Sequence, residues 1–156
     1  MNILICGDIV GKSGRDVIER LLPDLKSQND LDFVIVNAEN SASGFGITKK
    51  ICDQLYALGV DVITSGNHIW DQKEIINYID NDKRLIRPCN YSSETPGRGY
   101  CVFKLNNGNL ISVINVMCRL FMDNIDDPFK SVDEILNFLD KKLSNTIIIL
   151  EMIVLK

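Results

Sequence analysis

The sequence predicts an α/β fold in which helices cover at least one face of a mixed β-sheet, and three observations predict it. Short apolar runs alternate with amphipathic stretches over the first half of the chain, which is typical of βαβ units with parallel strands. A β-hairpin pattern follows, and its strands must be antiparallel. The 156 residues are 46% hydrophobic and 24% charged, and no repeat or linker divides them, which indicates one globular domain.

Apolar runs and helical spacing predict the first βαβ unit. Residues 2–6 predict the first strand, and residues 33–36 predict a second, buried strand. Between them apolar residues recur at helical spacing, and Pro23 predicts a kink or a restart in this helix. The residues that carry the helical spacing are Val17, Ile18, Leu21, Leu22 and Leu25.

Capping residues predict the next two helices. Thr48 is the expected N-cap of a helix that ends at Gly59, and residues 61–64 predict a third strand. Asp71 is the expected cap of a further helix. The apolar residues expected on the inward faces are Ile51, Cys52, Leu55 and Leu58 in the first of these helices and Ile75, Ile76 and Ile79 in the second.

The second half of the chain changes pattern. Residues 100–105 and 110–116, joined by an Asn-Asn-Gly turn, predict a β-hairpin. Ser131 and Glu134 have the spacing of a capping box and predict the start of the last helix. A final strand is expected from Thr146 onward. Parallel units followed by a hairpin therefore predict a mixed sheet.

Composition and targeting signals define the expected compartment and partners. The net charge is −4 and the charges are interspersed without a basic stripe, so we expect no duplex nucleic acid partner. No signal peptide or bilayer-length apolar stretch is found, so we expect no membrane association. The five cysteines form no CxxC pair. Reduced thiols in a cytoplasmic protein are therefore expected.

Side chains of the kinds that bind metals follow each of the first three predicted strands. Asp8 follows the first strand, and Glu39 and Asn40 follow the second. Asn67 and His68 follow the third. Because the carboxyl ends of parallel strands meet at one edge of a sheet, we expect these five side chains to converge. Carboxylate, amide and imidazole groups suit divalent Mg, Mn, Fe or Zn, so the sequence predicts a metal site there.

Each of these residues also has a purely structural interpretation. Asp8 can cap the helix that follows it, and Asn40 and Asn67 can occupy turn positions. His68 is the single histidine of the chain, and a lone histidine is more often structural than functional. Trp70 is expected to pack in the core rather than to stack on a substrate.

Two nucleotide-binding patterns are incomplete in this sequence. Gly-Lys-Ser at 11–13 resembles the end of a phosphate-binding P-loop, but Cys6 stands where that motif needs its first glycine. Gly-Phe-Gly at 44–46 is followed by Lys49 where a dinucleotide fingerprint needs a third glycine. Neither pattern predicts a bound nucleotide cofactor.

A set of motifs, taken together, resembles a known family. The motifs are Gly-Asp-Ile-Val-Gly at 7–11, Asn-Ala-Glu-Asn at 37–40, Gly-Asn-His-Ile-Trp-Asp at 66–71, Arg-Pro-Cys-Asn at 87–90 and Thr-Pro-Gly-Arg-Gly at 95–99. Their order and spacing resemble the bacterial YmdB-like family of calcineurin-type metallophosphoesterases. The likeness runs from Met1 to about Thr146.

The resemblance implies both a fold and an activity. The fold would be the N-terminal part of an αββα sandwich with mixed sheets, and the activity a metal-dependent hydrolysis of phosphodiesters, with 2',3'-cyclic nucleotides as the substrate class. In such a site two metal ions hold the phosphoryl oxygens and activate a water molecule. His68 would protonate the leaving oxygen. The implied metal ligands are Asp8, Glu39, Asn40 and Asn67.

The end of the chain departs from the family pattern. The family continues with Asp-Phe-His and Gly-Thr-His-Thr-His segments that supply three histidine ligands, whereas His68 is the single histidine here. We therefore expect at most one metal ion, drawn from Fe, Mn, Mg or Zn. We interpret residues 1–149 as a partial metallophosphoesterase domain and residues 150–156 as an aberrant tail, with no second domain. A frameshift or premature stop is the expected origin of that tail.

Three functional hypotheses follow from these observations. The first is a metal-dependent phosphodiesterase that retains activity with one metal ion. The second is a catalytically inactive, truncated product of a decaying gene. The third is a module that binds a nucleotide or phosphate without hydrolysing it.

Overall fold

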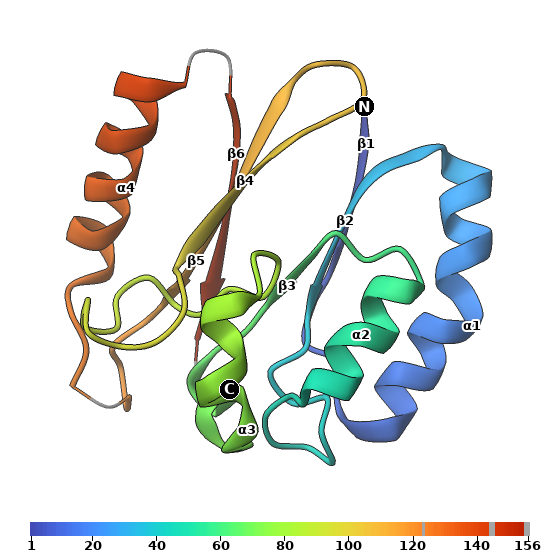
Figure 1. The fold of residues 1–156 in the computed structure, drawn as a ribbon, viewed down its shortest axis with the longest axis horizontal. Helices are drawn as coiled ribbons and strands as arrows, with labels where there is room; N and C mark the ends of the chain where they lie inside the picture. Colours follow the sequence, from blue (N-terminus) through green and yellow to red (C-terminus); the bar gives the residue numbers. More distant parts are fainter. Residues whose placement is uncertain (123, 144–145, 155–156) are drawn as a thin grey trace.

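The computed structural model describes residues 1–122, 124–143 and 146–154, so two residues of the expected tail, 155 and 156, lie outside the described part. Two three-stranded sheets form the middle of the molecule (Figure 1). Helix α4 covers one side, and α1 and α2 cover the other (Figure 1). This arrangement confirms the predicted α/β fold class with sheets between helices, and one of the two sheets is mixed.

Helices and strands alternate through the first half of the chain, and a hairpin, a helix and a strand make up the second half. In chain order the elements are β1 (Asn2–Cys6), α1 (Gly11–Asn29), β2 (Leu31–Asn37), α2 (Lys49–Ala57), β3 (Val62–Thr64), η1 (Asn67–Trp70), α3 (Glu74–Tyr78), η2 (Ile79–Asn81), β4 (Tyr100–Lys104), β5 (Leu110–Met117), α4 (Pro128–Lys142) and β6 (Thr146–Ile153).

The first sheet is parallel and has the order β1-β2-β3. Its central strand β2 is buried on both faces. Val34 and Val36 pack in the core under the helices, whereas Phe33 and Ile35 pack against the second sheet. A strand covered on both faces needs a continuous apolar run, which is the pattern that predicted this strand.

The second sheet is mixed and has the order β4-β5-β6. Strands β4 and β5 form the predicted antiparallel hairpin, and β6 adds to β5 in parallel. Strand β6 continues without interruption through residues 150–153, which belong to the segment expected to be an aberrant tail. These four residues are therefore part of the sheet.

Helix α1 does not restart at Pro23, one of the two outcomes expected there. The helix is continuous from Gly11 to Asn29, with Pro23 inside it. Within this helix Ile18 and Leu22 are buried. The remaining apolar residues of the predicted stripe are exposed, namely Val17, Leu21 and Leu25.

One helix cap was predicted correctly and two were wrong. The Thr48 side chain accepts a hydrogen bond from the Ile51 N–H and caps α2 as predicted. Asp71 does not cap α3, because its carboxylate binds the His68 ring instead. Helix α4 begins at Pro128 rather than at the predicted Ser131–Glu134 box, because Asp127 accepts from the Lys130 N–H.

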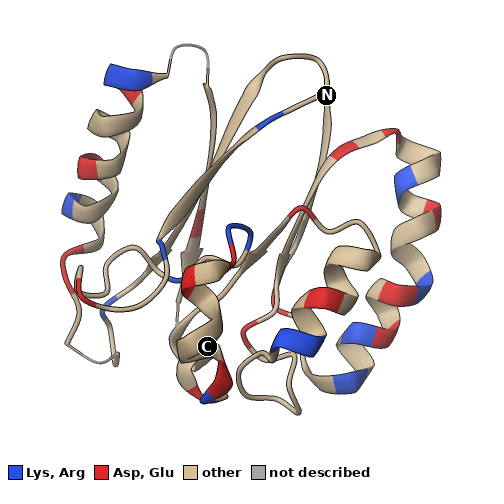
Figure 2. Cartoon of the chain, viewed as in Figure 1, with Lys and Arg blue, Asp and Glu red and all other residues tan. Residues whose placement is uncertain are grey.

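Charged residues lie mostly on the helices and loops, and blue and red positions are interspersed (Figure 2). The strands are mostly free of charge, as expected for sheets packed between other layers. All five cysteines are free thiols, as their spacing predicted. Among the described residues, no helix combines the length and the apolarity that a bilayer span needs.

Candidate functional site

Backbone hydrogen bonds join the loops that follow β1, β2 and β3. The Ile9 N–H donates to the Asn37 carbonyl at 3.0 Å, and the Gly11 N–H donates to the Asn40 carbonyl at 2.9 Å. The Ala38 N–H donates to the Thr64 carbonyl at 3.1 Å. These bonds hold the three loops together at one edge of the sheet, where convergence was expected.

Asp8 and Asn40 are in direct contact at this edge. Asn40 Nδ2 donates to Asp8 Oδ2 at 2.9 Å. Asp8 does not cap α1, since the N-cap position belongs to Val10, which makes no side-chain cap bond. The capping interpretation of Asp8 is therefore wrong, and its carboxylate faces the end of β2.

Glu39 is a buried carboxylate with one unsatisfied oxygen. Glu39 is 6% exposed, and its Oε2 has no hydrogen-bond partner among the described residues. Burial raises the pKa of Glu39, and the Asp8 carboxylate raises it further, while the His68 backbone N–H lowers it by hydrogen bonding. A buried acid that lacks a partner is costly unless a proton or a cation satisfies it.

Gly66 provides the space that the Glu39 carboxylate occupies. A Cβ atom at position 66 would lie 2.7 Å from Glu39 Cδ and 2.9 Å from Ile153 Cγ2. Both distances are shorter than van der Waals contact. The close approach of these two side chains therefore requires a glycine before Asn67, although the φ of Gly66 is not positive.

A carboxylate and an aromatic ring orient His68. Its Nδ1 lies 2.6 Å from Asp71 Oδ2. The Phe45 ring meets the imidazole edge-on, with 5.2 Å between the ring centroids. The ring is partly exposed, so a bonded carboxylate fixes the orientation of an accessible imidazole.

Asn67 and Trp70 lie at the two ends of η1. Asn67 follows Gly66 directly and is partly exposed. Trp70 packs against the core under the helices and meets the Tyr91 ring at 6.0 Å between centroids. Trp70 is thus a partly buried packing residue against the core, which agrees with the expected packing role.

Three side chains of this edge escape prediction from the sequence. Asp71 is three residues after His68, a spacing that signals contact in a helical turn, but the same residue also fits a helix cap. Asn37 accepts from the Glu39 N–H at 3.1 Å, and although it opens the Asn-Ala-Glu-Asn motif at 37–40, it was not among the predicted site residues. Glu151 has no local motif either, and the signal that could have found it is its position as the one charge in an apolar run.

The donor set fits a divalent cation in part. Glu39 offers an unpartnered buried oxygen, and Asp8 and Asn40 are oxygen-bearing side chains of the same edge. Such oxygens suit hard cations. Among the described residues, however, no group of three or more His, Cys, Asp and Glu side chains is arranged to hold a metal. The site therefore matches a partial ligand set based on two carboxylates with amide support.

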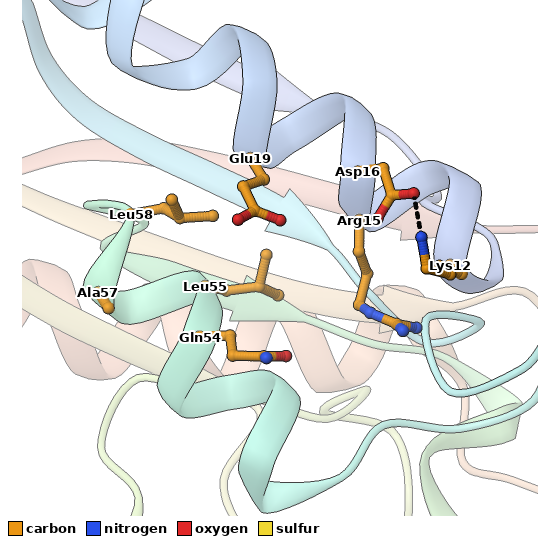
Figure 3. A pocket seen from close by; sticks show the side chains of 8 residues that line it. All are labelled: Lys12, Arg15, Asp16, Glu19, Gln54, Leu55, Ala57 and Leu58. Atoms are coloured by element: carbon orange, nitrogen blue, oxygen red, sulfur yellow. Dashed lines mark hydrogen bonds and ion pairs between the residues drawn. The ribbon is translucent and has the colours of Figure 1, made fainter.

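A separate groove lies between α1 and α2 (Figure 3). Its volume is about 510 Å³, and none of the candidate residues lines it. Lys12 Nζ and Asp16 Oδ2 pair at 2.7 Å beside it (Figure 3). The residues that line the groove are Lys12, Arg15, Asp16, Glu19, Gln54, Leu55, Ala57 and Leu58.

The chain is similar to proteins of one family. The family model described as "YmdB-like protein" matches residues 4–153. A Bacillus subtilis (strain 168) relative, described as a 2',3'-cyclic-nucleotide 2'-phosphodiesterase, is 45% identical over 136 residues, which are 87% of this chain and 51% of the relative. The chain spans about half the length of the curated relatives it matches.

Two solved structures have the same fold. A hypothetical protein from Thermus thermophilus matches with a TM-score of 0.89 and 32% identity, over 100% of this chain and 59% of that one. A novel phosphatase from Mycoplasma pneumoniae matches with a TM-score of 0.84 and 33% identity, over 97% of this chain and 55% of that one.

Proposed function

The chain belongs to the YmdB-like protein family, and from this premise we propose that it carries part of a metal-dependent phosphodiesterase site. The site lies where β1, β2 and β3 end. The observation that carries the proposal is the buried Glu39 carboxylate, whose Oε2 has no partner among the described residues. An apolar or amide side chain would fill this position at lower cost if the role were structural.

Four side chains would hold the cation. The proposed ligands are Asp8, Glu39, Asn40 and Asn67. When bound, the cation would polarise the phosphoryl oxygens and lower the pKa of a water molecule. The chain itself supplies the negative charge of Asp8 and Glu39, close enough for their carboxylates to repel each other. Removing one of them should weaken cation binding more than removing either amide, since carboxylates carry the charge.

His68 would act as the proton donor. The Asp71 carboxylate accepts from Nδ1–H, which orients the ring, and the imidazolium form of His68 would then donate its Nε2–H proton to the substrate. A donor fixed in this way protonates the leaving oxygen of a phosphodiester without reorganising. The substrate class proposed for the chain is 2',3'-cyclic nucleotides, because the Bacillus subtilis relative is described as a 2',3'-cyclic-nucleotide 2'-phosphodiesterase.

Hydrolysis of a generic phosphodiester, bis(p-nitrophenyl) phosphate, with Mn²⁺ tests the proposal. We expect metal-stimulated hydrolysis that falls roughly 10²- to 10⁴-fold in His68→Ala, the usual contribution of a general acid. Asp8→Ala should lose both hydrolysis and Mn²⁺ binding. Equal rates in the parent and both variants would overturn the proposal. A comparison of 2',3'-cyclic with 3',5'-cyclic AMP then tests the substrate class.

A second candidate function is binding of a phosphate or nucleotide without hydrolysis. The observation that favours it is that no group of three or more His, Cys, Asp and Glu side chains among the described residues is arranged to hold a metal. Calorimetry with 2',3'-cyclic AMP and Mn²⁺ distinguishes the two functions. Binding heat without product would support the second function, whereas product formation would exclude it.

A further inference from the structure

Glu151 is a charged residue on the inward face of β6. The neighbouring residues Leu150 and Met152 are each 46% exposed, whereas Ile153 is buried. A strand at the edge of a sheet normally places apolar residues inward and charge outward, because burial of a carboxylate is costly. In β6 this arrangement is reversed, because a carboxylate points inward and its two apolar neighbours point outward. Solubility does not explain this reversal.

The Glu151 carboxylate reaches across to the first sheet. In its own sheet Glu151 lies beside Asn115 of β5. Asn37 Nδ2 donates to Glu151 Oε1 at 3.3 Å. Burial raises the pKa of this carboxylate, and the nearby Thr64 hydroxyl and the Asn37 amide partly offset that rise. Asn37 and Thr64 are the last residues of β2 and β3. Glu151 thus faces the two strand ends from which the candidate site extends.

Asn37 connects Glu151 to Glu39. Its Oδ1 accepts from the Glu39 N–H at 3.1 Å while its Nδ2 donates to Glu151. Asn37 is 2% exposed, so both ends of its amide are satisfied inside the protein. An acceptor at the position of Glu151 therefore helps to hold the amide in this orientation.

The electrostatic surroundings show why a mere packing role is a poor explanation. Asp8 and Glu151 repel each other, and both carboxylates act on Glu39. One oxygen of Glu151 is buried without a hydrogen-bond partner in the described part of the chain. A neutral acceptor would orient Asn37 without this repulsion. A carboxylate here is tolerable if a cation binds nearby.

We propose that Glu151 is a positioning residue for the Glu39 carboxylate, acting through Asn37. It holds the main chain at the end of β2 so that Glu39 faces Asp8. Its effect on a cation is indirect, because the Asn37 amide stands between Glu151 and the Glu39 main chain. The inference rests on the proposed metal site, but its first test needs no metal.

Amide hydrogen exchange of the Glu39 N–H in the metal-free chain is the first test. Glu151→Ala should speed this exchange about tenfold, because Asn37 loses the acceptor that orients it. Glu151→Gln should restore most of the protection, since its side-chain oxygen can accept from Asn37 Nδ2. Met152→Ala, an exposed neighbour on the same strand, is the matched control and should change nothing. Unchanged exchange in Glu151→Ala would overturn the proposal.

Mn²⁺ affinity measured by calorimetry is the second test. Glu151→Ala should weaken binding roughly 10- to 100-fold, the usual effect of removing a group that orients a metal ligand. Glu151→Gln should recover most of that affinity. Equal weakening of Mn²⁺ binding in both variants would show that the negative charge of Glu151 supports binding rather than its hydrogen bond to Asn37. That result would overturn the proposal.

A double variant separates positioning from simple unfolding. Asn37→Ala should weaken Mn²⁺ binding as Glu151→Ala does. The double variant should bind Mn²⁺ no more weakly than Asn37→Ala alone, because both substitutions break the same series of hydrogen bonds. Additive losses would overturn the proposal. If the parent shows no Mn²⁺ binding, the metal site of the proposed function fails, while Glu39 exchange still decides the role of Glu151.

Discussion

At the scale of single residues, the edge of the first sheet contains groups whose placement has an energetic cost. Glu39 is buried with an oxygen that has no partner among the described residues, and Gly66 leaves room for it. Burial also raises the pKa of Glu151, although the Thr64 hydroxyl and the Asn37 amide lower it. Residues that are destabilising where they stand are typical of functional sites.

A methyl group at position 66 should destabilise the chain. Gly66→Ala would place a Cβ against Glu39 Cδ and Ile153 Cγ2, and such overpacking typically costs about 1–3 kcal/mol. Urea unfolding followed by circular dichroism measures the change. Gly7→Ala is the matched control, since a Cβ there meets nothing within 4 Å. Equal stabilities of the two variants would contradict the steric argument.

Asp61 should make stability depend on pH in the acidic range. Burial raises its pKa from the ordinary value of 3.8, although the Val34 N–H, Lys26 and Arg84 lower it. The folded chain therefore holds the Asp61 proton more tightly than the unfolded chain. The stabilisation is complete below the ordinary pKa and is lost as pH rises through the raised value.

Asp61→Asn tests this dependence, because the amide oxygen can still accept from the Val34 N–H, a bond of 2.8 Å in the parent. Thermal unfolding of both proteins should be followed from about pH 3 to about pH 7. The parent should lose stability relative to the variant as pH rises. A constant difference across this range would refute the assigned shift.

At the scale of elements, helix starts depend on which side chain reaches the free N–H groups. Ser131 and Glu134 have capping-box spacing, but Asp127 lies before Pro128, a favoured first residue, and accepts from the Lys130 N–H at 3.0 Å. Two valid signals therefore compete within a short stretch of chain. The earlier one prevails because it adds a helical turn.

Asp127→Ala should therefore destabilise the chain by about 1 kcal/mol, the usual cost of removing an N-cap side chain. Ser131→Ala should have an effect below about 0.5 kcal/mol, as a helix position without a capping role does. Asp127→Asn keeps the cap and removes only the exposed pair with Arg119, so it serves as the control. Chemical denaturation gives all three values, and a larger loss in Ser131→Ala than in Asp127→Ala would reverse the assignment.

At the scale of the whole molecule, each sheet has edge strands among the described residues. Strand β1 borders one sheet and β6 borders the other. The outward side chains of β6 and of the residue after it are apolar and exposed, namely Ile148, Leu150, Met152 and Val154. A long edge strand with an apolar outer face invites pairing between molecules.

A charge on this edge should reduce association. Met152→Lys should lower concentration-dependent light scattering while leaving the midpoint of thermal unfolding nearly unchanged, because the side chain is already 46% exposed. Asn106→Lys adds the same charge in the exposed β4–β5 turn and is the control. If both variants scatter like the parent, association does not involve this edge.

The sequence by itself determined the elements and their order. Periods of two and 3.6 residues depend only on local geometry, so β1, β2, α2 and the β4–β5 hairpin lie where these patterns predicted. The convergence of the first three loops also followed, because parallel strands end at a common edge. The roles of the candidate ligands and of His68 remain predictions that the proposed experiments test.

Only the tertiary structure decided which polar groups are buried and what they contact. Glu151 lies 114 residues from Asn37, and their contact depends on how β6 pairs with β5 and how one sheet faces the other. Asp71 was predicted to cap a helix, whereas the η1 turn brings its carboxylate to the His68 ring. Long-range register and packing have no local period, so no pattern of neighbouring residues encodes them.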